Sequence, residues 1–484
     1  MDVKFMPAVD SAVELLLTAG LVILTIFSIN LTLLILARLL LPKRHLMTAT
    51  PEDADLPEVL VQLPLFNEGR LVERILAAVM AMDWPRDRLH IQVLDDSTDG
   101  SLALSRHAVA VLLKDGVQIE LLHRVQRTAF KAGALATGLE RSDAPFVAIF
   151  DADFIPPPDF LRNTVGILIA QPDLGYVQTR WGHLNRDDSL LTRIQARLLD
   201  AHFRVEQEAR WRLGLPIPFN GTCGVWRRAA IDAAGGWEGD TLTEDLDLSL
   251  RARLRGWRSG YRMDLAVPGV LPVSTRAWRI QQFRWTKGFV QCFVKLMTLI
   301  WSSHSLAIWQ KLMISLQIGQ PLAFLLGAAC LALSLPFIAG AAVAGETLGQ
   351  VAMVTSILGF AAPISFLMLA GNTGSARATL AEVVGALALT SGLLLSNARA
   401  GMEALVGYQT EFVRTPKTMT AQAHLRWRYG LIELVAGFGL LGFVLSVEPI
   451  AVFYLAVVIS GLLGVGTMQI LDGLALAKTS DTRQ

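Results

Sequence analysis

Phe146-Val147-Ala148-Ile149-Phe150-Asp151-Ala152-Asp153 is the stretch that decides the fold. Five consecutive apolar residues predict a buried strand, and two carboxylates follow where that strand ends. Runs of strand-like and helix-like pattern alternate before it. The strand-like runs lie at 59–63, 90–94 and 118–122, and the helix-like runs lie at 68–82, 101–113 and 131–140. This alternation predicts a mostly parallel sheet with helices on both faces.

Acidic residues follow two of these predicted strands. Asp95 and Asp96 come after the run at 90–94, and Asp151 and Asp153 come after 146–150. In open α/β sheets the ligand sits at the carboxyl ends of the strands. The sequence therefore predicts a ligand site at the edge of the sheet where these carboxylates meet.

The composition indicates a membrane protein with a hydrophilic insert. Hydrophobic residues make up 52% of the 484 and charged residues only 18%. Residues 15–41 are almost entirely apolar, which exceeds the roughly 20 residues needed to cross a bilayer. Lys43, Arg44 and His45 follow that run, so the positive-inside rule places the N-terminus outside and the region from 43 onward in the cytoplasm. A net charge of +1 excludes a nucleic-acid polyelectrolyte partner.

Apolar runs return after residue 290, at about 312–340, 349–370, 378–396, 430–447 and 449–473. The basic loop at 397–429 is expected in the cytoplasm, and parity then requires that one earlier run does not cross. Glu382 interrupts 378–396, so this run is predicted to be interfacial or re-entrant. The C-terminus is predicted inside.

The predicted organisation has six parts. They are an N-terminal transmembrane helix (1–42), a cytoplasmic catalytic domain (43–285), interfacial helices (286–311), two transmembrane helices plus the interfacial or re-entrant helix (312–396), a cytoplasmic loop (397–429), and two transmembrane helices with a short tail (430–484).

The acidic clusters allow functional and structural interpretations. Asp151 and Asp153 can share one Mg²⁺ or Mn²⁺, because hard cations prefer carboxylate and phosphate oxygens, and such an ion would neutralise a diphosphate leaving group. Asp-x-Asp spacing is also common in ordinary loops. The cluster around Asp95 would equally suit a helix-capping turn.

Thr241-Leu-Thr-Glu-Asp-Leu-Asp247 forms a third acidic cluster. Thr241 and Glu244 fit a capping box, whereas a functional interpretation makes one acid a general base that deprotonates a sugar hydroxyl. The residues alone favour the cap.

Gln281-Gln-Phe-Arg-Trp285 also allows a structural and a functional interpretation. It fits an interfacial amphipathic helix with an aromatic-belt Trp, or a site in which Arg284 binds diphosphate and Trp285 stacks on a sugar.

Taken in order, the motifs resemble one family. They are Val61–Glu68 (VQLPLFNE), Gln92–Asp99 (QVLDDSTD), Lys131–Leu135 (KAGAL), Val147–Phe154 (VAIFDADF), Val177–Trp181 (VQTRW), Val205–Glu208 (VEQE), Phe219–Thr222 (FNGT), Thr243–Asp247 (TEDLD) and Gln281–Trp285 (QQFRW). The series looks like glycosyltransferase family 2, in its processive cellulose-synthase-like branch. It is most similar to the cellulose-synthase-like A group, the glucomannan 4-β-mannosyltransferases, and their bacterial relatives. The resemblance implies a GT-A-like nucleotide-diphospho-sugar transferase domain inserted between transmembrane α-helices.

The resemblance also implies roles. Asp95 and Asp96 would hold the nucleotide, and Lys131 would lie near its phosphates. Asp151 and Asp153 would bind the metal–diphosphate, with Asp153 closest to the ion. Asp245, the Asp of the family's Thr-Glu-Asp motif, would be the general base, which replaces the capping interpretation.

The remaining implied roles concern the acceptor and a loop. Phe219, Asn220, Gly221 and Thr222 would flank the acceptor end of the chain. Gln281, Arg284 and Trp285 would hold the diphosphate and the acceptor's terminal sugar. Phe412, Thr415 and Lys417 resemble the gating loop of cellulose synthase.

The expected function is a processive inverting β-glycosyltransferase. It would polymerise hexose from GDP-mannose or UDP-glucose into a β-linked, β-1,4 polysaccharide and move the polymer across the membrane. The alternative is transfer of a single sugar to a membrane lipid. A channel with a nucleotide-sensing domain is disfavoured, because few charges lie inside the apolar runs.

The expected partners are a nucleotide sugar donor, a growing polysaccharide acceptor, a divalent cation and the lipid bilayer, with no nucleic acid and with any export partner unidentified. The expected location is the inner or plasma membrane, if the source is bacterial.

Overall fold

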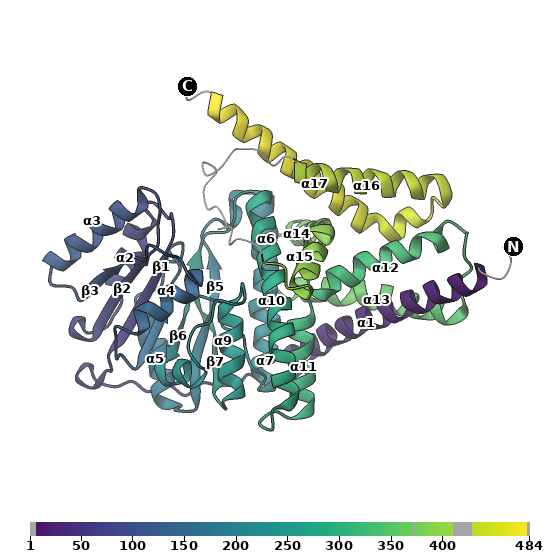
Figure 1. Cartoon of the computed structure of the whole chain (residues 1–484). Coiled ribbons are helices and arrows are strands. Elements are labelled where there is room, and N and C mark those ends of the chain that lie inside the picture. The colour runs from purple at the N-terminus through teal and green to yellow at the C-terminus, as the bar shows by residue number, and fades with distance from the viewer. Residues whose placement is uncertain (1–5, 372–373, 410–427, 482–484) are drawn as a thin grey trace.

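The computed structural model describes residues 6–371, 374–409 and 428–481. A seven-stranded sheet lies at one end of the molecule and long apolar helices extend from the other (Figure 1). The sheet has the order β3-β2-β1-β4-β6-β5-β7. Its strands are β1 (Val59–Leu65), β2 (Leu89–Asp95), β3 (Ile119–Leu122), β4 (Phe146–Ile149), β5 (Leu174–His183), β6 (Gly224–Arg227) and β7 (Arg258–Gly269).

The prediction of a mostly parallel sheet is confirmed. Strands β3, β2, β1 and β4 run parallel, β5 pairs parallel with β7, and only β6 runs antiparallel to its neighbours β4 and β5. The carboxyl ends of β1, β2 and β4 therefore lie along one edge, as the acidic strand ends required.

The sheet is covered on both faces. Helices α2 (Leu71–Met80), α3 (Ser101–Lys114) and α5 (Phe160–Ala170) contribute to the hydrophobic cluster on one face. Helices α4 (Phe130–Leu139), α8 (Arg228–Ala233) and α9 (Glu244–Leu254) contribute to the other. Strand β1 serves both clusters by the period-2 rule: Val59, Val61 and Leu63 face one and Leu60 faces the other.

The remaining helices connect the sheet to the apolar end. They are α1 (Met6–Leu40), α6 (Leu190–Ala201), a π-helical turn (His202–Gln207), α7 (Glu208–Leu213), α10 (Thr275–Ser302), α11 (Ile308–Gly319), α12 (Leu322–Ile338), α13 (Glu346–Met368), α14 (Ala376–Gly392), α15 (Leu394–Leu405), α16 (Arg428–Val447) and α17 (Ala451–Asp481).

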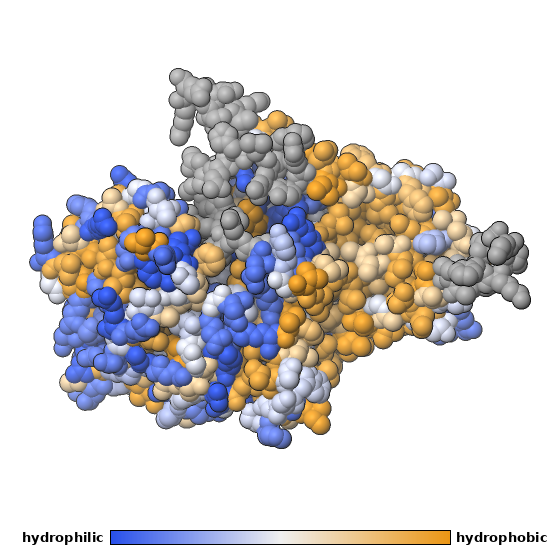
Figure 2. Space-filling model, in the orientation of Figure 1, coloured by the Kyte–Doolittle hydropathy of each residue, from blue (hydrophilic) through white to orange (hydrophobic). Residues whose placement is uncertain are grey.

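Four described helical segments are long and apolar enough to cross a membrane, which suggests an integral membrane protein. They are 11–40, 346–368, 430–447 and 455–474. Two further pairs are bent, α11 with α12 by 67° and α14 with α15 by 49°. Figure 2 shows the corresponding division, with hydrophobic side chains over the helices and hydrophilic ones over the sheet.

Helix α14 contains the charge that interrupts its apolar sequence. Glu382 is buried, and its carboxylate pairs with Arg197 at 2.7 Å and with Arg186 at 3.0 Å, both from the region of α6. The charge therefore joins α14 to the region of α6 next to the sheet. That α14 does not cross the bilayer stays a prediction.

Helix α10 runs without a break from Thr275 to Ser302. It carries Gln281–Trp285 and continues through the predicted boundary at 285/286, so the catalytic domain and the first interfacial segment share one helix.

Candidate active site

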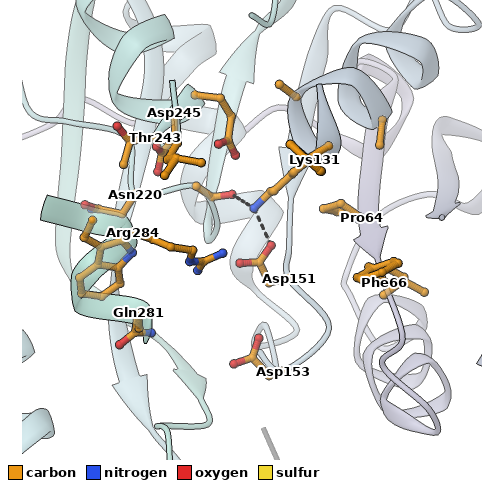
Figure 3. A pocket seen from close by; sticks show the side chains of 18 of the residues that line it. Pro64, Phe66, Lys131, Asp151, Asp153, Asn220, Thr243, Asp245, Gln281 and Arg284 are labelled. Atoms are coloured by element: carbon orange, nitrogen blue, oxygen red, sulfur yellow. Dashed lines mark hydrogen bonds and ion pairs between the residues drawn. The ribbon is translucent and has the colours of Figure 1, made fainter. Parts of the chain in front are cut away.

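A cleft of about 270 Å³ opens where strands β1, β2 and β4 end, between the sheet and helices α9 and α10 (Figure 3). Most of the predicted site residues line it together. These are Asp96, Lys131, Asp151, Asp153, Asn220, Gly221, Asp245, Gln281, Arg284 and Trp285. Side chains separated by up to 189 positions in the sequence thus share one cleft, which supports a single functional site.

Lys131 lies at the centre of the cleft. Its Nζ donates to Asp151 Oδ1 at 2.6 Å and to the Gly221 carbonyl at 2.9 Å. Burial lowers the pKa of Lys131, but Asp151, Glu244 and Asp245 outweigh burial, so the pKa is raised and the ammonium stays charged. The lysine follows two residues with positive φ, Ala129 and Phe130, a strained conformation of the kind found at functional sites.

Asp151 and Asp153 both project into the cleft, and the guanidinium of Arg284 points toward Asp151 (Figure 3). The Asp151 amide donates to Thr222 Oγ1 at 2.9 Å, which fixes the backbone after β4. Two carboxylates on one short turn provide an oxygen donor set that fits a hard divalent cation. Asp151 and Asp153 are therefore the residues that would hold it.

The two acids after β2 have different environments. Asp96 lines the cleft and pairs with Arg124, whose Nη2 lies 2.5 Å from Asp96 Oδ2. Asp95 is fully buried and does not line the cleft; its Oδ1 accepts from the Ser97 amide at 2.8 Å. Of these two acids only Asp96 lines the cleft, and that either acid holds a nucleotide stays a prediction.

Arg127 and Phe66 line the cleft beside Asp96 and were not singled out from the sequence. The Arg127 guanidinium stacks 3.3 Å from the Phe66 ring centroid and approaches Asp96 Oδ2 at 4.0 Å. Burial lowers the pKa of Arg127, although Asp96 opposes this effect. The available signal was Arg124-Val-Gln-Arg127, two cations directly after a predicted strand.

Helix α9 presents two neighbouring acids to the cleft. Burial, and then the charge of Glu244, raise the pKa of Asp245 to about 7. Burial also raises the pKa of Glu244. A carboxyl group with a pKa near neutrality is suited to general acid–base chemistry.

The alternative interpretation of Thr241 and Glu244 as a capping box, already replaced by the resemblance, does not describe the start of α9. The N-cap of α9 is Thr243, which makes no side-chain capping bond. The hydroxyl of Thr241 is buried, and no hydrogen bond to it occurs in the described part of the chain. The local pattern suggested a cap, but Glu244 and Asp245 instead line the cleft.

Gly221 brings the main chain against Asp245. Its φ is +77°, and a Cβ there would lie 3.0 Å from Asp245 Oδ2. The neighbouring residue Asn220 is held in place by its backbone N–H, which donates to Gln178 Oε1 at 2.9 Å.

Phe219 and Thr222 flank this turn but do not line the cleft. Phe219 is 1% exposed and packs against Tyr176 and Trp226. Thr222 is buried and accepts the Asp151 amide. Both therefore support the site from the core. Phe412, Thr415 and Lys417 lie outside the described residues.

The opposite wall comes from α10. Gln281, Arg284 and Trp285 all line the cleft, and burial lowers the pKa of Arg284 against the pull of Glu244, Asp151 and Asp245. The Trp285 ring centroid lies 6.4 Å from that of Trp181, giving two indoles on one side of the cleft.

Glu238, Asp240 and Asp247 form another acidic group, close enough together to hold a metal ion. Lys295 Nζ lies 2.6, 2.7 and 3.0 Å from their respective carboxylates. The Lys295 ammonium therefore occupies the space between these carboxylates, and it ties the start of α9 to α10.

Lys287 connects α10 to the end of α15. It is fully buried, and its Nζ donates to Glu403 Oε2 at 3.0 Å and to the Tyr408 carbonyl at 2.7 Å. The next residue, Gln409, lines the cleft. Lys287 thus fixes the segment that brings residue 409 to the site.

Replacing Lys287 with Met is expected to raise the KM for the donor several-fold, with a smaller change in kcat. The Tyr408 carbonyl loses its anchor, while Glu403 keeps Arg399 at 2.8 Å. Loss of an interaction made equally in ground and transition states raises KM rather than lowering kcat. Steady-state kinetics on purified protein measure both values. A fall in kcat at constant KM would contradict this positioning role.

Comparison with known proteins finds similarity over about half of the chain. Residues 57–288 match the family model described as "Glycosyltransferase like family 2". The chain is 44% identical over 272 residues to a probable glucomannan 4-beta-mannosyltransferase 4 of Oryza sativa subsp. japonica, covering 55% of this chain and 49% of that protein. It is 43% identical over 281 residues to glucomannan 4-beta-mannosyltransferase 2 of Arabidopsis thaliana, covering 56% and 52%. The chain thus spans about half the length of the curated relatives that it matches.

One solved structure supports the fold. The mannosyltransferase PcManGT of Pyrobaculum calidifontis, in complex with GDP-Man and Mn²⁺, superposes with a TM-score of 0.52 at 22% identity, covering 77% of this chain and 99% of that one. At this identity the likeness concerns the fold, which is GT-A-like.

Proposed function

From the premise that residues 57–288 are a glycosyltransferase family 2 domain, we propose that this chain is a processive inverting β-glycosyltransferase. It joins hexose units from a nucleotide sugar into a β-1,4-linked polysaccharide. The observation that carries the proposal is the position of Asp245. This carboxyl group, with a pKa of about 7, lies in the same cleft as Lys131, Asp151 and Arg284.

The proposed reaction is a single displacement. The acceptor hydroxyl oxygen attacks the anomeric carbon of the donor, and Asp245 takes the hydroxyl proton. The bond from that carbon to the β-phosphate oxygen breaks, and the electron pair leaves with the nucleoside diphosphate. Attack from the face opposite the leaving group converts an α-linked donor into a β-linked product.

Positive groups in the cleft stabilise the departing diphosphate. Arg284 and Lys131 provide cationic donors; Lys131 is hydrogen-bonded to Asp151, and Arg284 lies in the field of the same carboxylates. A divalent cation held by Asp151 and Asp153 supplies further charge neutralisation when bound. Asp96, Arg127 and Phe66 lie where the nucleoside end of the donor would bind.

The relatives favour mannose as the sugar. Those at 43–44% identity are named as glucomannan 4-beta-mannosyltransferases, so GDP-mannose is the first donor to test and UDP-glucose the second. Trp181 and Trp285 suit the acceptor, because indole faces bind the apolar faces of sugar rings.

The multi-helix apolar half supports polymer synthesis coupled to transfer across the membrane, with the catalytic domain in the cytoplasm. The competing proposal is transfer of one sugar to a membrane lipid. The acidic residues of the cleft would serve that reaction equally well, so they do not distinguish the two.

The deciding experiment incubates membranes containing the full chain with each radiolabelled donor, and then digests the product with β-1,4-mannanase or β-1,4-glucanase. A long product that one of these enzymes degrades supports the proposal. A product that extracts with lipid and carries one sugar would favour the competing activity.

The pH dependence tests the environment of Asp245. A general base must be deprotonated, so activity is expected to fall as pH decreases through about 7. The negative charge of Glu244 contributes to the raised pKa of Asp245, so Glu244→Gln is expected to move this acid limb to lower pH. Rates between pH 5 and 9 at saturating donor measure the limb. An unchanged limb in the variant would show that another group sets it.

A further inference from the structure

A second cavity, of about 770 Å³, lies beside the first, between strand β5, helix α6 and the ends of helices α13 and α14. Gly182 and His183 line both cavities. The second cavity differs chemically from the cleft, because arginines outnumber carboxylates in its lining, where the carboxylates are Asp187, Asp200 and Glu382. Its arginines are Arg180, Arg186, Arg193 and Arg204.

The positive charge of this cavity is only partly balanced. Asp200 is shared by His183 and three arginines, at distances from 3.3 to 3.7 Å. Glu382 is shared by Arg186 and the buried Arg197. Within the described ranges, Arg193 has no carboxylate within ion-pair distance. The surplus charge and this unpaired guanidinium indicate an anionic ligand.

The cavity lies at the end of a candidate membrane span. The span on α13 ends at Met368, and Ala370 and Gly371 line the cavity directly after it. Arg197 Nη1 donates to the carbonyls of Leu367 and Gly371 at 3.0 Å each, which holds this helix end against α6. The cavity therefore lies at the depth expected for lipid headgroups.

Exposed apolar side chains surround this position. Met368 and Leu369 are exposed at the end of α13, and Leu380 and Val384 are exposed on α14. Leu190, at the start of α6, lines the cavity and is half exposed. A small inorganic anion would leave these apolar side chains exposed, whereas the acyl chains of a lipid would cover them.

We propose that this arginine-lined cavity binds the phosphate of one anionic phospholipid headgroup, with the acyl chains along α13 and α14. Guanidinium groups match phosphate oxygens, and basic pockets between membrane helices are known to bind anionic headgroups. The site adjoins the reaction cleft through His183 but does not depend on which sugar the enzyme uses.

The test is native mass spectrometry of the full chain in detergent, titrated with phosphatidylglycerol or phosphatidylcholine. One phosphatidylglycerol per chain is expected to bind at least about tenfold more tightly than phosphatidylcholine. The double variant R193A/R204A is expected to weaken this binding about 30-fold, from about 1 kcal/mol for each arginine near an anionic surface. Asp200 keeps Arg180, His183 and Arg186 in this variant, so no carboxylate loses its last partner.

A milder variant and a matched control keep the test decisive. Arg193→Gln breaks no ion pair in the described part of the chain and is expected to weaken binding about fivefold. R106A/R141A removes two exposed arginines from elsewhere on the catalytic domain and should leave lipid binding unchanged. Equal binding of the two lipids, equal loss in the control, or displacement of the lipid by millimolar inorganic phosphate would each overturn the proposal.

Discussion

Asp245→Asn is expected to lower kcat by at least about 10³-fold while the affinity for the donor changes by less than about threefold. The amide has nearly the same shape as the carboxyl group but cannot accept the hydroxyl proton at neutral pH. Asp245 lines the cleft at the start of α9, next to Gly221, and is not among the groups proposed to hold the diphosphate. Polymer synthesis from radiolabelled donor measures kcat, and calorimetric titration with the nucleoside diphosphate measures binding.

Glu244→Gln is the matched control for this prediction. It removes a neighbouring carboxylate from the same helix turn and the same cleft. If Asp245 is the base, the control retains most of its activity at pH 8 and differs mainly in its acid limb. Full activity of Asp245→Asn would refute the assignment, and equal inactivation by both changes would show only that the cleft needs two acids.

Asp153→Asn is expected to lower activity by at least about 100-fold at low Mn²⁺ or Mg²⁺, with partial recovery as the metal concentration rises. The change replaces one anionic oxygen ligand with a neutral amide of nearly the same shape. The affinity for the metal ion therefore falls while the geometry of the cleft is preserved. Activity across a metal titration, after treatment with EDTA, measures the apparent affinity. Loss of activity on chelation in the unaltered protein is part of the same expectation.

Asp240→Asn separates this site from the other acidic group. Asp240 also lines the cleft, but its carboxylate is already ion-paired with Lys295, whose Nζ lies 2.7 Å away. We therefore expect the metal titration of this variant to follow that of the unaltered protein. If the apparent metal affinity changes in Asp240→Asn but not in Asp153→Asn, the metal site would have to be assigned to Glu238, Asp240 and Asp247 instead.

The sheet and its acidic edge were predictable because they rest on local sequence. Continuous apolar runs specify parallel strands, and the carboxyl ends of such strands meet at one edge. That rule placed Asp96, Asp151 and Asp153 in one cleft before any long-range contact was known. The later strands β5, β6 and β7 were not singled out from the sequence, although helices separate them along the chain as well.

The finer assignments depended on single-residue register. Strand β2 extends to Asp95, one residue beyond the predicted end, so Asp95 is buried with the sheet and only Asp96 enters the cleft. Successive side chains of a strand point to opposite faces, and a shift of one residue reverses their roles. The same limit applies to Phe219, which packs into the core while its neighbour Asn220 reaches the cleft.

Contacts between distant segments have no counterpart in the periodic pattern of the sequence. Trp181 and Trp285 come together across 104 positions, and Arg127 stacks on Phe66 across 61. Their pairing follows from the topology of the sheet and the path of α10. The sequence can nominate such residues by type, but not by partner.

The uninterrupted path of α10 decides how the protein can be handled. Arg279, near its start, binds Glu433 on α16 and Gln469 on α17, whereas Lys295, nearly three turns after Trp285, holds the loop before α9. The family match ends at residue 288, in the middle of this helix. A water-soluble fragment cut there would keep every acidic residue of the cleft but would lose the Lys295 contacts and the partners of Arg279. The catalytic half is therefore not a module that can be transplanted, and exchanging parts between relatives should keep residues 275–302 with the membrane helices that brace them.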